Sequence, residues 1–450
     1  MNQFKITLLL LFLLIASSLS AQEMLDQYLK IGLENNLILK EKGISLEKSL
    51  LALKDARSYF LPSVHFGATY NLANGGRVID IPIGDLLNGV YSTLNQLTQS
   101  KAFPQLDNIS EQFLPNNFYD ARFRISMPII NPDLAYQKDI REKQVIVSEY
   151  DLAIYRANLI QDIKIAYYNY CTAHTAIEVI KSSKVLVTQN LRDNQSLLEN
   201  GKGLPAYVLR AESEVENINA LMIEAANREQ NAIYYLNFLI NRELDSEVVF
   251  EEQQPDWASI TQLMAETNLS ARPEILQIST LGSIRETQLK SSKNFWIPRL
   301  NTFADLGSQA FDFEVNTQSS TYILFGLNLG IPVFNGGRNR TQIQRATLDI
   351  KSIDYQKELV NDKLSLDLRI AKNELKTNEA AFRSAKIKFE SASAYLRLID
   401  RGFKEGSNSL IEFIDARSQY TQAALQQTIN AYALLKAQAS LERQLNTETN

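Results

Sequence analysis

Cysteine, histidine, glycine and proline are all scarce in this sequence. Its 450 residues include one cysteine, Cys171, and two histidines, His65 and His174. A single cysteine cannot form an internal disulfide. One cysteine and two histidines also argue against a His/Cys metal site or a Cys–His catalytic dyad. Glycine occurs 17 times and proline 11 times. So few turn residues predict long uninterrupted elements rather than the roughly three compact domains that the length would suggest.

The sequence also lacks an excess of positive charge, a late hydrophobic run and an enzymatic motif. Lysine and arginine number 46 against 51 aspartates and glutamates, a formal charge of −5, so we expect no nucleic-acid partner. Beyond the N-terminus no apolar stretch is as long as the about 18 residues that a membrane-spanning helix needs. Gly336-Gly337 is not followed by the Lys-Ser/Thr of a phosphate loop, and no nucleophile–base pair stands out. We therefore expect neither an enzyme nor a bound metal or cofactor.

Residues 1–21 are typical of a signal peptide. Lys5 precedes an apolar run from Ile6 to Leu19, and Ser20 and Ala21 are small residues suited to cleavage. A membrane anchor is the alternative, but the run is short for a span. Export would place the protein in the periplasm, outside the cell, or in the outer membrane as strands.

The remaining chain contains an internal duplication. Phe60-Leu61-Pro62 recurs as Trp296-Ile297-Pro298, Met127–Asn131 as Ile331–Asn335, and Leu198–Gly201 as Phe403–Gly406. These pairs define a first repeat over residues 22–240, an intervening segment over 241–271, and a second repeat over 272–446. The first repeat alone has a long loop, 73–118, with an amphipathic piece over 85–99.

Each repeat predicts helix, strand, loop, strand, long helix, turn and long helix. The long helices are expected over 133–200, 205–240, 338–401 and 409–446. Apolar residues recur in them at alternating spacings of four and three, for example Leu159, Ile163, Ala166, Tyr170, Ala173 and Ile177, and later Leu364, Leu368, Ala371 and Leu375. This pattern is typical of coiled-coil packing. A second, weaker stripe favours a ring or tube of helices, with an ordinary antiparallel bundle as the alternative.

The short segments 63–72, 119–128, 299–308 and 320–334 alternate apolar and polar residues, with Phe303 breaking the pattern. About ten such residues are typical of a transmembrane barrel strand, although a soluble sheet packed on one face would look similar. Four strands cannot close a barrel, and an open edge is not tolerated in lipid. Two chains would give eight strands and a filled interior, whereas three would give twelve strands and a lumen.

These features resemble the TolC-type outer-membrane efflux protein family over essentially the whole mature chain. Three kinds of motif carry the resemblance. Phe60-Leu61-Pro62 and Trp296-Ile297-Pro298 lead from a helix into a strand, Ile331–Arg338 leads from a strand back into a helix, and Phe403–Arg417 forms the second helical tip. The resemblance implies a mainly α fold with transmembrane β: a homotrimer with a twelve-stranded barrel, four strands from each chain, and an α-helical tunnel through the periplasm. It also implies a mixed equatorial region, in which we expect the inter-repeat segment 241–271.

The same resemblance implies a function, a location and partners. It implies the outer-membrane channel of a tripartite efflux or type I secretion system in a diderm bacterium, surrounded by outer-membrane lipid. The implied partners are a periplasmic adaptor (a membrane fusion protein) and an inner-membrane transporter that supplies the energy. A periplasmic coiled-coil scaffold without a pore is the alternative, but it gives the four strands no role. The 73–118 loop would then be extracellular, either a cap over the pore or an ornament.

The candidate functional residues lie at the two helical turns. Gly201, Gly203 and Leu204 in the first turn, and Gly406 and Ser407 in the second, are expected to form the adaptor-docking tips, with plain hairpin turns as the alternative.

Glu412 and Asp415 share one helix face just past the second tip. The resemblance places them at the tunnel entrance, where three chains would form carboxylate rings that attract cations. A solvated helix face is the alternative. The family's gate arginine, tyrosine and first-repeat acid are replaced here by Asn408, Phe403 and Tyr207. We therefore expect a gate held by packing of Phe403 and Tyr207 more than by an ionic latch.

Overall fold

The computed structural model describes residues 23–314 and 319–447, so the predicted signal peptide, 1–21, lies outside the described residues. The elements are α2 (Glu23–Asn35), α3 (Leu37–Ser58), β1 (Ser63–Asn71), β2 (Val78–Ile81), α4 (Ile83–Thr98), β3 (Ile109–Gln112), β4 (Phe118–Ile130), α5 (Pro132–Glu199), α6 (Pro205–Leu239), α7 (Trp257–Ala265), α8 (Pro273–Lys293), β5 (Arg299–Phe311), β6 (Thr321–Gly330), α9 (Arg338–Lys404) and α10 (Leu410–Leu445). They divide into two compact units, which are described in turn.

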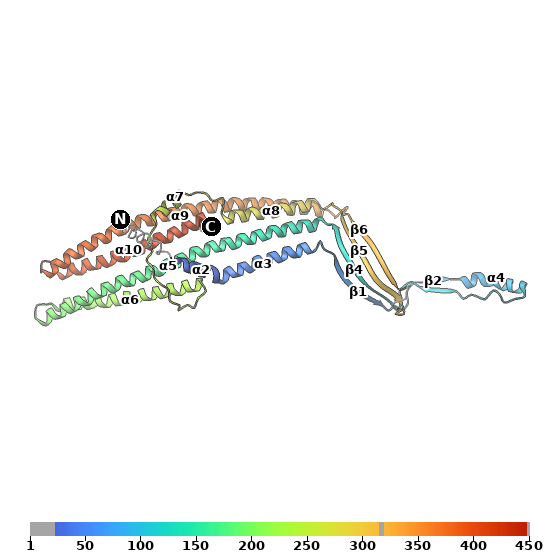
Figure 1. Cartoon of the computed structure of the whole chain (residues 1–450), viewed down its shortest axis with the longest axis horizontal. Helices are drawn as coiled ribbons and strands as arrows, with labels where there is room; N and C mark the ends of the chain where they lie inside the picture. The colour runs from blue at the N-terminus through green and yellow to red at the C-terminus, as the bar shows by residue number, and fades with distance from the viewer. Residues whose placement is uncertain (1–22, 315–318, 448–450) are drawn as a thin grey trace, which may run out of the picture. The chain divides into compact units, whose positions relative to one another are not determined.

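Within the described residues, the helical unit contains 23–51, 142–286 and 347–447. Two antiparallel hairpins, α5–α6 and α9–α10, form its body (Figure 1). The predicted seams are buried as expected: Leu159, Ile163, Ala166, Tyr170, Ala173 and Ile177 on α5, and Leu364, Leu368, Ala371 and Leu375 on α9. Burial of this continuous stripe is what holds helices of 68 and 67 residues together, because propensity alone contributes little.

Two hydrophobic clusters anchor the helical unit away from the turns. In the first, Leu25 and Tyr28 of α2 pack with Tyr167 of α5, Leu236 of α6 and Tyr432 of α10. In the second, the short helix α7 packs on the other hairpin through Ile260 and Leu263 against residues that include Leu375 and Leu434. The segment between the repeats thus joins the packing through α7.

A buried charge network ties α8 to the C-terminal part of α10. Glu274 accepts hydrogen bonds from Arg272 Nη2 and Arg443 Nη2, each at 2.7 Å, and Arg443 Nε donates to Asn158 Oδ1 on α5 at 2.6 Å. Burial alone would raise the pKa of Glu274, but the two arginines outweigh it and hold the pKa at about 2. Both arginines are almost fully buried, so the carboxylate compensates two cations that water does not reach.

The strand unit contains residues 52–141 and 287–346. Its main sheet is antiparallel in the order β1-β4-β5-β6, so strands of the two repeats meet at the β4–β5 pair. A separate two-stranded ribbon, β2–β3, carries α4 (Figure 1).

The predicted last strand, 320–334, is too long, because β6 ends at Gly330. Pro332 has no amide hydrogen and restricts the residue before it, so the ladder does not continue there.

The polar face of the sheet holds an ordered charge network. Arg124 donates to Asp305 twice, from Nε at 2.7 Å and from Nη2 at 2.6 Å, directly across the β4–β5 pair. Phe303, which breaks the alternation, lies on this face opposite Gly326, with its ring 5.1 Å from the Arg124 guanidinium. A side chain at residue 326 would collide with the Phe303 ring, so the glycine makes room for the misplaced aromatic.

Within the described part of the chain, no helix has both the length and the hydrophobicity needed to cross a membrane.

Glu274→Gln should lower stability by about 3 kcal/mol at pH 7, because it removes the charge that compensates two buried arginines. A carboxylate with a depressed pKa stabilises the fold above its ordinary pKa of 4.5, and this contribution is lost as the pH falls toward about 2. The difference in thermal unfolding between the wild type and Glu274→Gln should therefore be full at pH 7 and shrink below pH 4.5. A difference that does not change with pH would contradict this account.

Candidate functional site at the helical turns

The first turn, between α5 and α6, is built on two glycines. Gly201 has a φ of +69°, the left-handed region that favours glycine. The amides of Lys202 and Gly203 both donate to the Leu197 carbonyl, at 2.8 and 2.9 Å, and close the end of α5. A Cβ on Gly203 would lie 2.7 Å from the backbone nitrogen of Leu198, so only glycine fits. Leu204 then precedes Pro205, the first residue of α6, and its side chain is exposed.

The second turn, between α9 and α10, uses one left-handed glycine and a capping box. Gly406 has a φ of +76°, and the Ser407 amide donates to the Gly402 carbonyl at 2.8 Å. Ser409 begins α10: its hydroxyl accepts from the Glu412 amide at 3.2 Å, and the Glu412 carboxylate accepts from the Ser409 amide at 2.7 Å.

The two acidic candidates both lie on the exposed face of α10 but have different local partners. Glu412 is held by its own helix end, and hydrogen bonds from Ser409 and from Asn408 lower the pKa of its carboxyl group. Asp415 accepts from Gln419 Nε2 at 2.7 Å, one turn further along. The Glu412 carboxylate is therefore ionised near neutral pH and is fixed in position by the start of its own helix.

The turns contact each other through an aromatic cluster. Leu410, Phe413 and Ile414 of α10 are buried, and Tyr207 of α6 and Phe403 of α9 pack against them. The Phe403 and Phe413 rings stack at 5.1 Å with an interplanar angle of 15°. The structure thus brings the two predicted gate residues into one cluster and adds Phe413 as its centre. Because Tyr207 comes from the first hairpin, this cluster joins the two hairpins of one chain.

A buried ion pair that is not among the predicted site residues lies one turn beyond this cluster. Arg417 of α10 is only 3% exposed, and its Nη2 lies 3.6 Å from Glu214 Oε2 on α6. Glu214 Oε1 also forms an ion pair with Arg210 Nη2, at 3.4 Å. Burial lowers the pKa of Arg417, an effect that Glu214 opposes, and Nη1 is buried without a hydrogen-bond partner among the described residues. A signal for this pair exists in the sequence, because Arg417 occupies an inward position between apolar Phe413 and Ala424.

The helix contacts near the turns continue with polar residues. Ser183 of α5 and Thr421 of α10 are buried and share a hydrogen bond of 3.0 Å. Asn190 and Asn194 of α5 are also buried, and Asn194 Nδ2 donates to the Asn190 carbonyl at 2.7 Å. Polar contacts lose less free energy than hydrophobic ones when water replaces them. These polar contacts alternate with buried apolar residues such as Val187 of α5 and Ala211 of α6, so the packing near the turns is mixed.

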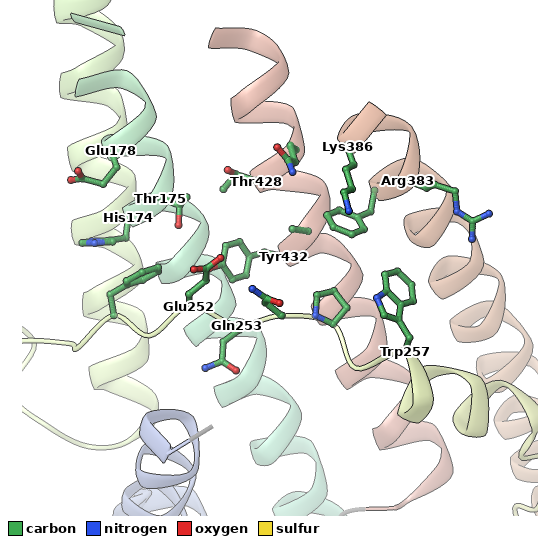
Figure 2. Close-up of a pocket in the computed structure, with 16 residues that line it drawn as sticks. His174, Thr175, Glu178, Glu252, Gln253, Trp257, Arg383, Lys386, Thr428 and Tyr432 are labelled. Atoms are coloured by element: carbon green, nitrogen blue, oxygen red, sulfur yellow. The ribbon is translucent and has the colours of Figure 1, made fainter. Parts of the chain in front are cut away.

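A cavity of about 830 Å³ lies where the segment between the repeats crosses α5, α10 and α9 (Figure 2). His174 pairs with Glu229 at 2.6 Å and stacks on Phe250 at 4.5 Å, and Trp257 stacks on Phe382 at 6.3 Å. Stacking at both ends fixes the crossing segment to the helices. Among the described residues, no group of three or more His, Cys, Asp or Glu side chains could hold a metal ion.

The comparisons with known proteins agree with this architecture. Residues 266–447 match the family model described as "Outer membrane efflux protein", which bears out the resemblance found in the sequence. The outer membrane protein TolC of Escherichia coli K12 is 20% identical over 96% of this chain and 84% of its own. The alkaline protease secretion protein AprF of Pseudomonas aeruginosa is 21% identical over 68% of this chain and 64% of its own. The solved CmeC outer membrane channel of Campylobacter jejuni matches with a TM-score of 0.74 and 16% identity, over 94% of this chain and 85% of that one.

The Arg417–Glu214 pair makes an asymmetric prediction. Glu214→Gln should cost about 3 kcal/mol because it leaves a buried guanidinium uncompensated, whereas Arg417→Met replaces the charge by an apolar side chain and should cost far less. In the double variant the loss from Glu214→Gln should largely disappear, since no buried charge is left unpaired. Thermal unfolding of the four proteins measures this, and simple additivity would show that the two residues do not interact.

Proposed function

We propose that this chain, similar to the outer membrane efflux proteins in sequence and fold, is one subunit of a trimeric outer-membrane channel. The channel is a passive conduit from the periplasm to the exterior, and its helical turns form the periplasmic gate. The observation that carries this proposal is the exposed apolar face of the sheet. Ile323 and Phe325 of β6 are 79% and 71% exposed, and Val64 and Phe66 of β1 are also exposed. A soluble sheet would cover this face, whereas lipid is a suitable neighbour for it.

The edges of the same sheet support three copies. Within the described residues β1 and β6 each pair with one strand only, so each leaves a row of backbone donors and acceptors open. Hydrocarbon offers these groups no hydrogen-bond partner, so β6 of one chain must pair with β1 of the next. Three copies form twelve strands around a lumen, and the Arg124–Asp305 face then lines it.

The turns suit a gate because their contacts are small and local. Opening must break the cluster of Tyr207, Phe403 and Phe413 and the Arg417–Glu214 pair. Glu412 and Asp415 of three chains would ring the entrance and favour cations. Gly201, Gly203, Leu204, Gly406 and Ser407 form the surface offered to a periplasmic adaptor, which links the channel to an inner-membrane transporter.

The cargo class has two candidates. The match to the outer membrane efflux protein family supports efflux, for which we propose small solutes as the first candidate cargo. The similarity to a relative named for protease secretion favours a second candidate, in which the same conduit carries polypeptide for a type I secretion system.

The native mass tests the proposal directly. After extraction from outer membranes in mild detergent, and with bound detergent subtracted, the particle should contain three chains of 51.0 kDa, roughly 150 kDa in all. A soluble monomer or dimer would overturn the channel and favour a periplasmic coiled-coil scaffold.

Phe403→Ala should raise basal conductance several-fold in planar bilayers, because it removes the ring that stacks on Phe413. Phe389→Ala provides a matched control, since this α9 aromatic packs on Tyr420 outside the cluster. An equal change in both variants, or none in either, would count against a gate held by this cluster.

Asp415→Asn should reduce the preference for cations over anions in single-channel recordings, and more so at low salt, where charges are less screened. Asp400→Asn is the control, because Asp400 is an exposed carboxylate near the same turn that already pairs with Lys404. Unchanged reversal potentials in Asp415→Asn would remove Asp415 from the ion path.

A further inference from the structure

The hairpin between β1 and β4 is an ordered structure rather than a loose loop. Asn88 exchanges two hydrogen bonds with the Leu106 backbone, both at 2.8 Å, and Asn95 does the same with the Phe103 backbone, at 2.7 and 3.0 Å. Gly84 lies so close to the Leu106 carbonyl that a side chain would not fit. The segment 103–108 is therefore fastened along one side of α4.

The other side of α4 carries an apolar stripe that nothing in the described chain covers. Leu86, Val90 and Leu97 are 70%, 54% and 76% exposed. With Thr93 they follow the spacing of four, three and four that defines a coiled-coil seam. The asparagines that bind segment 103–108 come from the opposite face, so the stripe points away from the hairpin's own partner.

We propose that the α4 stripe packs against α4 of the other two chains, so that the three hairpins form a helical cluster where they emerge from the barrel. This inference rests on the proposed trimer.

Continuity with the trimer favours a second copy as the occupant. The stem of the hairpin is held to the sheet, because Tyr70 Oη donates to Asn117 Oδ1 at 2.5 Å and the Ala73 amide donates to Asn116 Oδ1 at 2.9 Å. Three chains that close one barrel therefore bring three hairpins to one rim. Each brings an identical seam, which is what a symmetric cluster requires.

The charge of α4 argues against a lipid surface as the occupant. Asp85 is the only charged residue of the helix, and its carboxylate accepts from Asn108 Nδ2 at 3.0 Å. Helices that lie on membranes carry lysine and arginine on their polar face, and α4 has none. With a single charge, at its first turn and bonded to Asn108, α4 can approach identical copies with little repulsion.

The fold of the hairpin also benefits from a partner. An isolated two-stranded ribbon is marginally stable in water, and β2–β3 pairs only four residues with four. A helical cluster would stabilise all three ribbons together.

Cysteine cross-linking in intact trimers tests the inference. Leu97→Cys, with the native Cys171 retained because it is fully buried, should give a disulfide-linked dimer band under mild oxidation of whole cells. Gln96→Cys is the matched control, since its exposed side chain lies beside the seam rather than in it. The yield of disulfide-linked dimer should be several-fold higher for Leu97→Cys than for Gln96→Cys. It should also be independent of dilution, because the links form within one trimer.

Two readouts separate the possible failures. If both variants keep the mass of three chains but Leu97→Cys cross-links no better than Gln96→Cys, the helical cluster is wrong and the channel stands. If cross-linking falls with dilution, the stripes join separate particles and the inference is again overturned. A native mass below three chains would instead overturn the proposed function itself.

Discussion

The open edges of the four-stranded sheet are the constraint on which the proposed assembly depends. A backbone amide or carbonyl without a partner costs several kcal/mol in hydrocarbon. The main sheet has four strands in the order β1-β4-β5-β6, and its two edge strands, β1 and β6, do not pair with each other within one chain. Neighbouring copies of the chain must therefore supply the strand partners that its own edge strands lack. The apolar outer face and the Arg124–Asp305 inner face follow from the same alternation.

The interface between the two helical hairpins changes along its length. Near α2 and α7 the hairpins meet through buried aromatic and aliphatic side chains such as Tyr167 and Leu375. Nearer the turns, the Arg417–Glu214 pair and the Ser183–Thr421 hydrogen bond alternate with apolar contacts, among them the aromatic cluster and the packing of Leu425 against the cluster that includes Ile180. Apolar burial resists separation in proportion to area, whereas polar contacts exchange readily with water. The proposed gate therefore lies where polar contacts interrupt the apolar packing.

The duplication also shows which parts of the unit were free to change. Both repeats keep the strand pair and the helical hairpin, because each must contribute to the same sheet and the same seams. Among the described residues, only the first carries the β2–α4–β3 hairpin, which connects Asn71 to Phe118, the last pair of the β1–β4 ladder. An insertion at that point disturbs no strand pairing, because the ladder ends there. New surface could therefore be added without a change in the barrel.

The sequence by itself determined the order of elements, the helical seams and the strand faces. These depend on short periodicities of 3.5 and 2 residues, which neighbouring side chains impose wherever one face is buried. Its errors were local, as at β6, where Pro332 ended the ladder earlier than the alternation suggested. The tertiary structure alone decided the rest. Phe413 in the aromatic cluster, the Arg417–Glu214 pair and the fastening of α4 all depend on which side chains the fold brings within a few ångströms. A periodic pattern indicates that a position faces inward, but only the packed chain shows which residue, some two hundred positions away, it meets there.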